Sequence, residues 1–341
     1  MAKKAKSAAK AVRTTKANRG ISRRASKVAP ADQPARPVKK TNRAKKKRKP
    51  KVTAAGTVLT VTPNTFDQLL KEVADYKSLY ARDRDEILFR GQDNDWPLLP
   101  SLFRPRDPSS DFETWEIESD LFFEFKSQAS ALYGQGLSDW DVLFYMQHHR
   151  VPTRLLDWTN ILGVALYFVA LGANLKEEAK PCIWMLNPYL LNSNFEAKDL
   201  SADTPESEEY RNCDYWDPKY LGWDEDKDCY YEYGDLLVED DGIDWNAPLA
   251  IFPSRRNPRM IAQRGLFTIH GTDERPLDQI APYCLKKVVV RRELLGAVTE
   301  FVRHAGFNEA NVWADIDGLA RDLRMTHGYD PHPLRWGPKK G

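Results

Sequence analysis

Arg90 is the first residue whose type and position can do chemistry. It follows the apolar residues 87–89 and precedes Gly91. A planar guanidinium can hold a carboxylate or a phosphate with two hydrogen bonds. The glycine lets the backbone turn sharply or lets another group approach closely. The alternative is a structural arginine paired with a core carboxylate such as Asp157, since a buried charge needs a partner.

His148 and His149 form the second candidate, and they follow Gln147 at the end of a predicted helix. One of these histidines can titrate near neutral pH and act as an acid or a base. Adjacent residues do not face the same way on a helix, so they make a poor metal pair. The pattern predicts no metal site, and it leaves open whether His148 is functional or makes a structural hydrogen bond.

Residues 152–159 read Pro-Thr-Arg-Leu-Leu-Asp-Trp-Thr, a turn-forming start with a capping end. Thr159 or Asn160 can cap an apolar helix predicted over 161–173. The free N–H groups at a helix start favour an anion, so a phosphate-bearing ligand fits here. The alternative is a capping arrangement that satisfies its own polar groups.

Two further polar groups belong to the same analysis. Arg154 and Asp157 lie three residues apart, and we expect them to pair locally. Arg259, Gln263 and Gly265 precede an apolar strand. The Gln263 amide can bond a ligand or a backbone edge.

The signatures of several enzyme classes are missing from the sequence. It contains no Walker phosphate loop, no Gly-x-Gly-x-x-Gly, no Gly-x-Ser-x-Gly elbow and no His-Glu-x-x-His. These absences disfavour an ATPase, a Rossmann dehydrogenase, an ordinary serine hydrolase and a zinc protease.

The net charge of +2 hides a strong division along the chain. Residues 1–52 hold 20 Lys and Arg against one acid, Asp32, and the remaining residues hold 31 Lys and Arg against 48 Asp and Glu. The first segment has no aromatic residue and cannot bury enough apolar surface to order itself. We therefore expect residues 1–52 to be a disordered basic tail.

Nucleic acid is the partner that this basic tail predicts, because each neutralised phosphate releases counterions and adds affinity. The densest basic cluster is Lys45, Lys46, Lys47, Arg48 and Lys49. Three alternatives remain: a solvated tail, a tail that folds back onto the acidic body, and a targeting segment of the transit or nuclear type.

Helical and strand patterns alternate irregularly after residue 53, which favours an α+β domain with a mixed sheet and packed helices. Helices are predicted over 66–76, 112–133, 140–148, 161–173, 291–305 and 316–326. Strands are predicted over 57–62, 87–89, 182–186, 249–252, 266–270 and 284–290. We expect one compact domain over residues 53–330, followed by a tail over 331–341.

Residues 199–244 interrupt this domain with 17 acidic and three basic residues. Several Tyr and Trp accompany them, so we expect an irregular acidic insertion that packs partly through its aromatics. The four cysteines are widely spaced, which indicates free thiols in a reducing, cytoplasmic compartment. The longest apolar run, 161–173, holds about 13 residues, fewer than the roughly 20 that a membrane span needs.

Several separated motifs resemble, in order, those of FRG-domain proteins, a family named for Phe-Arg-Gly. They are Phe89-Arg90-Gly91-Gln92, Trp96 with 98–104, 147–149 with 152–159 and 165–168, Arg259 with Gln263, Gly265 and Phe267, and 314–320. The resemblance covers about residues 64–325. Arg150 departs from it, because the family usually has a small residue there, commonly glycine. The resemblance implies a role in bacterial or phage defence or toxin systems and a protein partner such as an antitoxin.

A more remote analogy connects these motifs with ADP-ribosyltransferases, in which an early strand arginine holds the dinucleotide and a late residue orients the acceptor. Arg90, Thr153 and Gln263 fill the matching positions. This first hypothesis makes the chain an enzyme that cleaves NAD or transfers ADP-ribose on or near nucleic acid. Its catalytic residues would be Arg90, His148, Arg154 and Gln263, and its NAD-binding residues would be Arg90, Gln92, Thr153, Asp157 and Thr159.

The second hypothesis is a binding module without catalysis. The motifs would then be structural, and the basic tail would make the nucleic-acid contact. The two hypotheses differ in one observable: whether Arg90, His148, Arg154 and Gln263 converge on one pocket that solvent can reach.

Overall fold

The computed structural model divides the chain into two units, residues 1–49 and 50–341. It describes residues 56–80, 87–105, 112–133, 136–173, 178–193, 223–224, 229–230, 232–238, 243, 245–253 and 258–330. The basic tail, the segment 331–341 and most of the acidic insertion lie outside the described residues. The expectations for those segments stay predictions.

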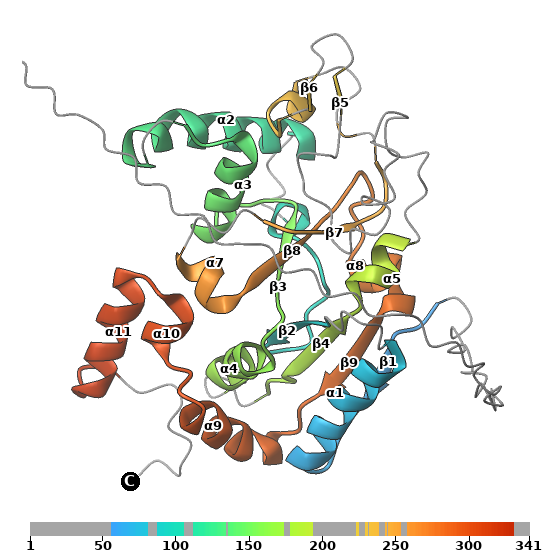
Figure 1. Cartoon of the computed structure of the whole chain (residues 1–341), viewed down its shortest axis with the longest axis vertical. Coiled ribbons are helices and arrows are strands. Elements are labelled where there is room, and N and C mark those ends of the chain that lie inside the picture. Colours follow the sequence, from blue (N-terminus) through green and yellow to red (C-terminus); the bar gives the residue numbers. More distant parts are fainter. Residues whose placement is uncertain are drawn as a thin grey trace, which may run out of the picture. The chain divides into compact units, whose positions relative to one another are not determined.

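A mixed sheet of seven strands forms the centre of the second unit, with strand order β1-β9-β4-β2-β3-β8-β7 (Figure 1). Only β1 and β9 pair in parallel, and the other neighbours are antiparallel. The strands are β1 (Leu59–Val61), β2 (Leu88–Gln92), β3 (Leu155–Thr159), β4 (Cys182–Leu186), β7 (Leu249–Ile251), β8 (Gly265–Ile269) and β9 (Leu285–Val289). Within the insertion, β5 (Trp223–Asp224) pairs with β6 (Cys229–Tyr230). The predicted α+β class is confirmed.

The sheet divides between β2 and β3. These strands share one residue pair in register, Phe89 with Thr159. By contrast, β2 pairs with β4, and β3 with β8, over five residues each. One half of the sheet is therefore β1-β9-β4-β2, and the other half is β3-β8-β7.

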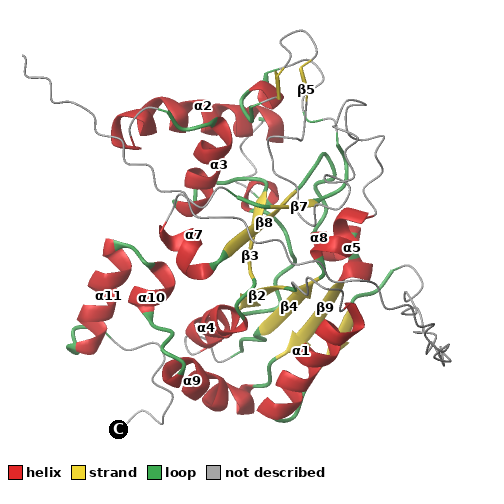
Figure 2. Ribbon diagram, in the orientation of Figure 1, coloured by secondary structure: helices red, strands yellow, loops and turns green. Residues whose placement is uncertain are grey.

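On one face of the sheet, different helices cover the two halves (Figure 2). The described helices are α1 (Phe66–Tyr80), α2 (Thr114–Tyr133), α3 (Asp139–His148), α4 (Leu162–Ala173), α5 (Pro188–Ser193), α7 (Pro258–Gln263), α8 (Leu277–Ile280), α9 (Leu295–His304), α10 (Glu309–Trp313) and α11 (Ile316–Thr326). None of those that the structure describes has the length and apolar character of a membrane span.

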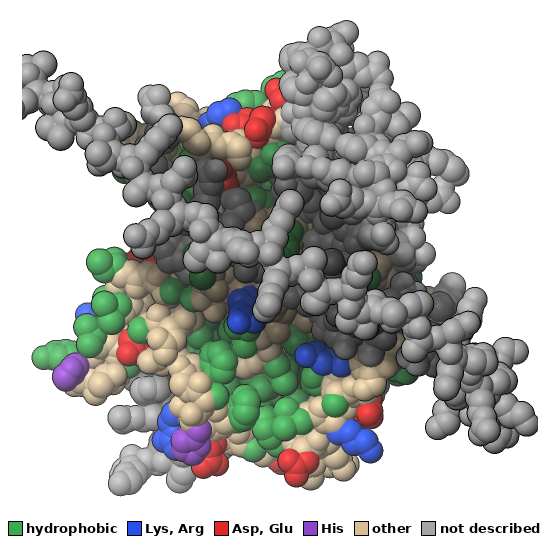
Figure 3. All heavy atoms as spheres, viewed as in Figure 1, with side chains coloured by type: hydrophobic (Ala, Val, Ile, Leu, Met, Phe, Trp, Pro, Cys, Tyr) green, Lys and Arg blue, Asp and Glu red, His purple; other side chains and the backbone are tan. Residues whose placement is uncertain are grey.

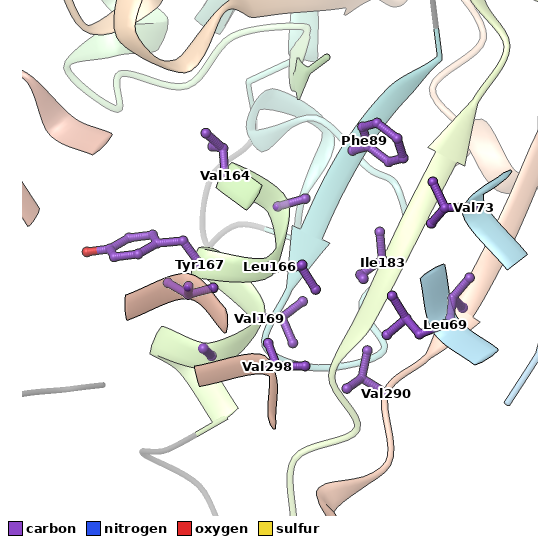
Figure 4. Close-up of a cluster of buried hydrophobic side chains, with 14 of the residues drawn as sticks. Leu69, Val73, Phe89, Val164, Leu166, Tyr167, Val169, Ile183, Val290 and Val298 are labelled. Carbon is purple, nitrogen blue, oxygen red and sulfur yellow. The ribbon is translucent and has the colours of Figure 1, made fainter. Parts of the chain in front are cut away.

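The first half-sheet packs against α1, α4 and α9 through the largest hydrophobic cluster. In Figure 4, side chains of α4 and α1 meet Phe89 and Ile183 of the strands, and the Tyr167 hydroxyl points away from the sheet. Helix α4 is apolar nearly all round, which suits its central place. On the face drawn in Figure 3, hydrophobic side chains gather around α1 and α4, with Lys or Arg side chains beside them and further charged groups along the lower edge.

The second half-sheet packs on the same face against α2 and α3. Leu155, Phe267 and Leu249 join Phe144 and Met146 there in a second cluster. A third cluster covers the opposite face of both halves, and it includes residues of α5 and α8. Alternate residues of each strand therefore enter different clusters, as the pleat of a strand requires.

Residues 155–159 form a strand that the sequence interpretation missed. We assigned a turn to Pro152, a helix cap to Thr159 or Asn160 and core positions to the Leu residues and Trp158. The core positions are confirmed, but the segment is strand β3, paired with β8 over its whole length. Leu155 enters the second cluster, whereas Leu156 and Trp158 enter the third. Burial on both faces hides the period-two pattern that identifies a strand from sequence.

Gly91 lies inside β2 rather than in a turn after it. A Cβ at this position would lie 1.9 Å from the carbonyl oxygen of Ala165 in α4. The glycine therefore serves close approach, the second of the two roles predicted for it. It brings α4 directly onto the strand that carries Arg90.

Candidate functional site

A pocket lies where α3, β3, α7 and β8 meet. It encloses about 330 Å³, part of it open to solvent. Its lining consists of Phe144, His148, Asp157, Trp158, Arg259, Met260, Gln263, Gly265 and Phe267. Two of the four predicted catalytic residues, His148 and Gln263, thus share one pocket with Asp157.

His148 is the last residue of α3, a helix that starts with a capping box of Ser138 and Asp141. Its carbonyl accepts a hydrogen bond from Nη1 of Arg259 at 3.3 Å, and its ring lies 4.6 Å from that of His149. Burial, followed by the charges of Arg259 and His149, lowers the pKa of His148 to about 4. We expected one of the two histidines to titrate near neutral pH, but the lowered pKa leaves the His148 ring uncharged there.

Asp157 supplies the carboxylate of the pocket, and its side chain is 56% exposed. Its Oδ2 accepts a hydrogen bond from Nε2 of Gln147 at 2.7 Å. Nη1 of Arg90 donates to its backbone oxygen at 2.8 Å and lies 3.7 Å from Oδ2. The carboxylate is therefore held from two sides and still open to solvent.

Arg90 occupies the gap between the two half-sheets. Its bond to the Asp157 carbonyl joins β2 to β3 where the strands no longer pair. The side chain is 18% exposed, and its Nε has no hydrogen bond in the structure. Burial lowers the pKa of Arg90, and the charge of Asp157 partly opposes this. The predicted alternative, a pair of Arg90 with Asp157, is what the structure shows.

A chain of hydrogen bonds connects Asp157 to the start of the same motif. The Gln147 side chain that donates to Asp157 accepts a bond from Oγ1 of Thr153 at 2.5 Å. The Thr153 N–H in turn donates to Oγ of Ser101 at 3.1 Å. Thr153 is buried, so its role in the structure is to orient Gln147.

Gln263 connects the pocket to the C-terminal helices. Its Nε2 donates to the Val312 carbonyl at 2.9 Å, and its own backbone oxygen accepts from Oγ1 of Thr159 at 2.5 Å. The same Thr159 oxygen accepts from the Ile161 N–H at 3.0 Å, just before α4. Thr159 is therefore buried and engaged, whereas the Gln263 side chain lines the pocket.

Arg154 and Gln92 are not among the residues that line the pocket. Arg154 forms a buried ion pair with Glu118, so the expected pair with Asp157 is wrong. The side chain of Arg154 is 7% exposed. Gln92 accepts a hydrogen bond from Nε1 of Trp184 at 2.9 Å in the third cluster. Both side chains are committed to contacts inside the protein.

Arg259 and the aromatic floor of the pocket, formed by Phe144 and Phe267, were not predicted as site residues. Arg259 stood in a sequence motif without a role, and that motif is the signal that could have found it. The rings of Phe144 and Phe267 stack at 5.3 Å with an interplanar angle of 8°. These aromatics come from elements far apart in the chain, so no local pattern marks them.

Metal and thiol chemistry find no support in the described part of the chain. No group of three or more His, Cys, Asp or Glu is placed there to hold a metal ion. Cys182 and Cys284 are buried free thiols. Burial raises the pKa of Cys182 to about 12, which makes it a poor nucleophile.

In the comparison with known families, the family model of the FRG domain matches residues 85–178. The chain carries an FRG domain. This FRG domain contains the polar chain from Arg90 through Asp157 and Gln147 to Thr153. Arg259 and Gln263 come from beyond it and complete the pocket. No curated protein and no solved structure matches the chain.

Proposed function

We propose that the FRG domain and the segment that completes its pocket cleave NAD at the bond between nicotinamide and ribose. The ADP-ribose passes to an acceptor or to water. The observation that supports this proposal is the pocket itself. It combines an oriented carboxylate, Asp157, with the guanidinium of Arg259 and an aromatic floor.

The chemistry follows from the bond that breaks. The C–N bond electrons leave with nicotinamide, and positive charge develops on the ribose ring. A fixed carboxylate beside that ring stabilises the charge, as in the cleavage of other glycosidic bonds. The acceptor then bonds to the ribose carbon, and its proton passes to solvent through the exposed Asp157. NAD and acceptor thus give ADP-ribosyl acceptor, nicotinamide and a proton.

Each remaining group has a distinct part in this proposal. Neutral His148 and the Gln263 amide hydrogen-bond the ribose or the acceptor. Arg90 acts as a positioning residue, because it holds the backbone and carboxylate of Asp157. The pocket is small and partly open to solvent, so in this proposal only the nicotinamide and its ribose enter it, and the rest of NAD lies along the rim.

The experiment is nicotinamide release from NAD by the full chain, with and without DNA or RNA. Asp157→Asn should lower the rate by about 100-fold or more, the usual scale for an electrostatic or acid–base group. Glu300→Gln removes an exposed carboxylate on α9 and should leave the rate unchanged. No release under any condition, or full activity in Asp157→Asn, would refute the proposal.

Arg90→Lys separates positioning from charge. It keeps the charge but not the planar donor geometry. We expect a lower rate with little change in the concentration of NAD that gives half the maximal rate. An unchanged rate would show that the planar guanidinium of Arg90 is not needed to position Asp157.

The basic tail supports a second function, nucleic-acid binding. The observation is its charge, 20 Lys and Arg against one acid over residues 1–52. Deleting these residues should abolish binding to DNA or RNA and flatten its salt dependence. Unchanged affinity after the deletion would remove this function. A tail on nucleic acid would concentrate the enzyme near its acceptor, and loss of NAD would harm a host cell, as expected of a toxin.

A further inference from the structure

Three arginines surround one indole ring beside the pocket. The Cζ atoms of Arg259, Arg321 and Arg150 lie 4.0, 5.3 and 5.4 Å from the centre of the Trp313 ring. Trp313 ends α10 and is 9% exposed. Arg259 also lines the pocket, so this cluster adjoins the proposed ligand site directly.

The nearby carboxylates are already engaged. Glu309 pairs with Arg321 at 3.0 Å and accepts a bond from the Tyr167 hydroxyl. Asp315 caps α11 by accepting from the Gly318 N–H at 2.6 Å. Asp157 accepts from Gln147. Asp157 and Asp315 keep their charge and act on Arg259, but neither makes an ion pair with Arg150 in the described part of the chain.

Arg150 is the member of the cluster that is open to a ligand. It is exposed, and within the described part of the chain its guanidinium has no hydrogen bond or ion pair. A guanidinium that lies over an aromatic face keeps its N–H donors in the plane, directed at other groups. Arg150 also follows His149 directly, at the end of α3 that carries His148.

The backbone of Arg150 is in the left-handed region, with φ of 64°. The Val151 N–H bonds the Met146 carbonyl at 3.0 Å and closes the end of α3. This position after a helix favours glycine, which has no Cβ to strain. The arginine is therefore not explained by the turn.

We propose that Arg150 binds a phosphate of the ligand whose other part occupies the pocket. The inference rests on the proposed function, and it assigns the diphosphate of NAD to the rim formed by Arg150, Arg259 and Trp313. Burial lowers the pKa of Arg259, and the charges of Arg150 and Arg321 lower it further against Asp157 and Asp315. A phosphate between the guanidinium groups would relieve this repulsion.

Arg150→Gly is the variant that tests the inference, because glycine suits the backbone and removes only the side chain. Binding of ADP-ribose, nicotinamide and inorganic pyrophosphate to the full chain is measured by calorimetric titration. We expect at least about tenfold weaker binding of ADP-ribose, the loss of one charge-assisted contact. Nicotinamide, which carries no phosphate, should bind as it does to the wild type, and the variant should melt at or above the wild-type temperature.

Arg303→Ala is the matched control, because it removes the same charge from an exposed position on α9 and should change nothing. Equal affinity of the wild type and Arg150→Gly for ADP-ribose would overturn the inference. So would a parallel loss of nicotinamide binding, which would place the effect in the pocket structure.

The two proposals fail in different ways. If the wild type binds no ADP-ribose and releases no nicotinamide, the proposed NAD chemistry fails. Pyrophosphate then decides the present inference. Binding by the wild type that is lost in Arg150→Gly would support a phosphate site, and no binding by the wild type would overturn it.

Discussion

Replacing Arg154 by methionine should strongly destabilise the fold. Its Nε donates to Glu118 at 2.7 Å, and Nη2 bonds the other carboxylate oxygen. Its Nη1 donates to the carbonyls of His270 and Gly271, each at 2.9 Å. Burial alone lowers the pKa of Arg154, but Glu118 and Tyr233 raise it above the usual value, so the charge persists.

The size of the effect follows from what methionine leaves behind. The Glu118 side chain is 3% exposed, and without Arg154 the Tyr233 hydroxyl is the charge-stabilising partner that remains to it among the described residues. Two backbone carbonyls lose a donor as well. Breaking a buried ion pair on one side costs about 3–5 kcal/mol. Arg154→Met should lower the free energy of unfolding by that amount.

Urea unfolding measures this difference in the free energy of unfolding. The dependence of that free energy on urea concentration should be the same in both proteins, which shows that the substitution leaves the unfolded state unchanged. Arg275→Met is the control, because the Arg275 side chain is exposed and the loss of its pair with Asp273 should cost far less than the loss of Arg154. The double variant Arg154→Met/Glu118→Leu should recover much of the loss, since no buried charge remains unpaired. A cost no larger than that of the control would refute the reasoning. A stable Arg154→Met protein that releases no nicotinamide would restore Arg154 as a catalytic candidate.

Two other changes test the fold around the site. Gly91→Ala places a Cβ against the Ala165 carbonyl and should prevent recovery of folded protein. Gly265→Ala is the control and should fold, because the atom nearest to its added Cβ lies at 3.6 Å. Equal yields of the two folded variants would contradict this packing. Burial, followed by Arg154, lowers the pKa of His270 to about 3. The unfolded chain therefore takes up the proton first, and stability should fall from about pH 6.5 to 3. His270→Phe should make this slope shallower by at most about 1.4 kcal/mol per pH unit, and equal slopes would exclude the effect.

Elements whose apolar residues recur at a regular spacing could be predicted from the sequence. The strand over residues 182–186 and the helix over 316–326 occur with the predicted bounds. Helices α5, α7, α8 and α10 were not predicted. They hold four to six residues, too few for a helical period to be recognised.

The ion-pair partners of the polar residues could be predicted only in part. For Arg90, a pair with a core carboxylate such as Asp157 was one of the two outcomes that the sequence predicted. The partner of Arg154 was not, since Glu118 lies 36 residues away, on helix α2. Sequence spacing suggested Asp157, three residues on. Arg154 lies just before β3, and the carbonyls of His270 and Gly271 hold its guanidinium beside Glu118.

The exposure of Asp157 depends on the divided sheet. Its same-face neighbours Leu155 and Thr159 are buried, so a continuous, covered sheet would bury Asp157 too. Helix α4 covers one half of this face and α3 the other, and Asp157 lies at their junction. Arg90 supplies a bond across the gap in place of the missing strand pairing. The carboxylate of the pocket therefore lies on the strand that Arg90 holds across this break in the ladder, and loss of the Arg90 side chain should free Asp157 to move.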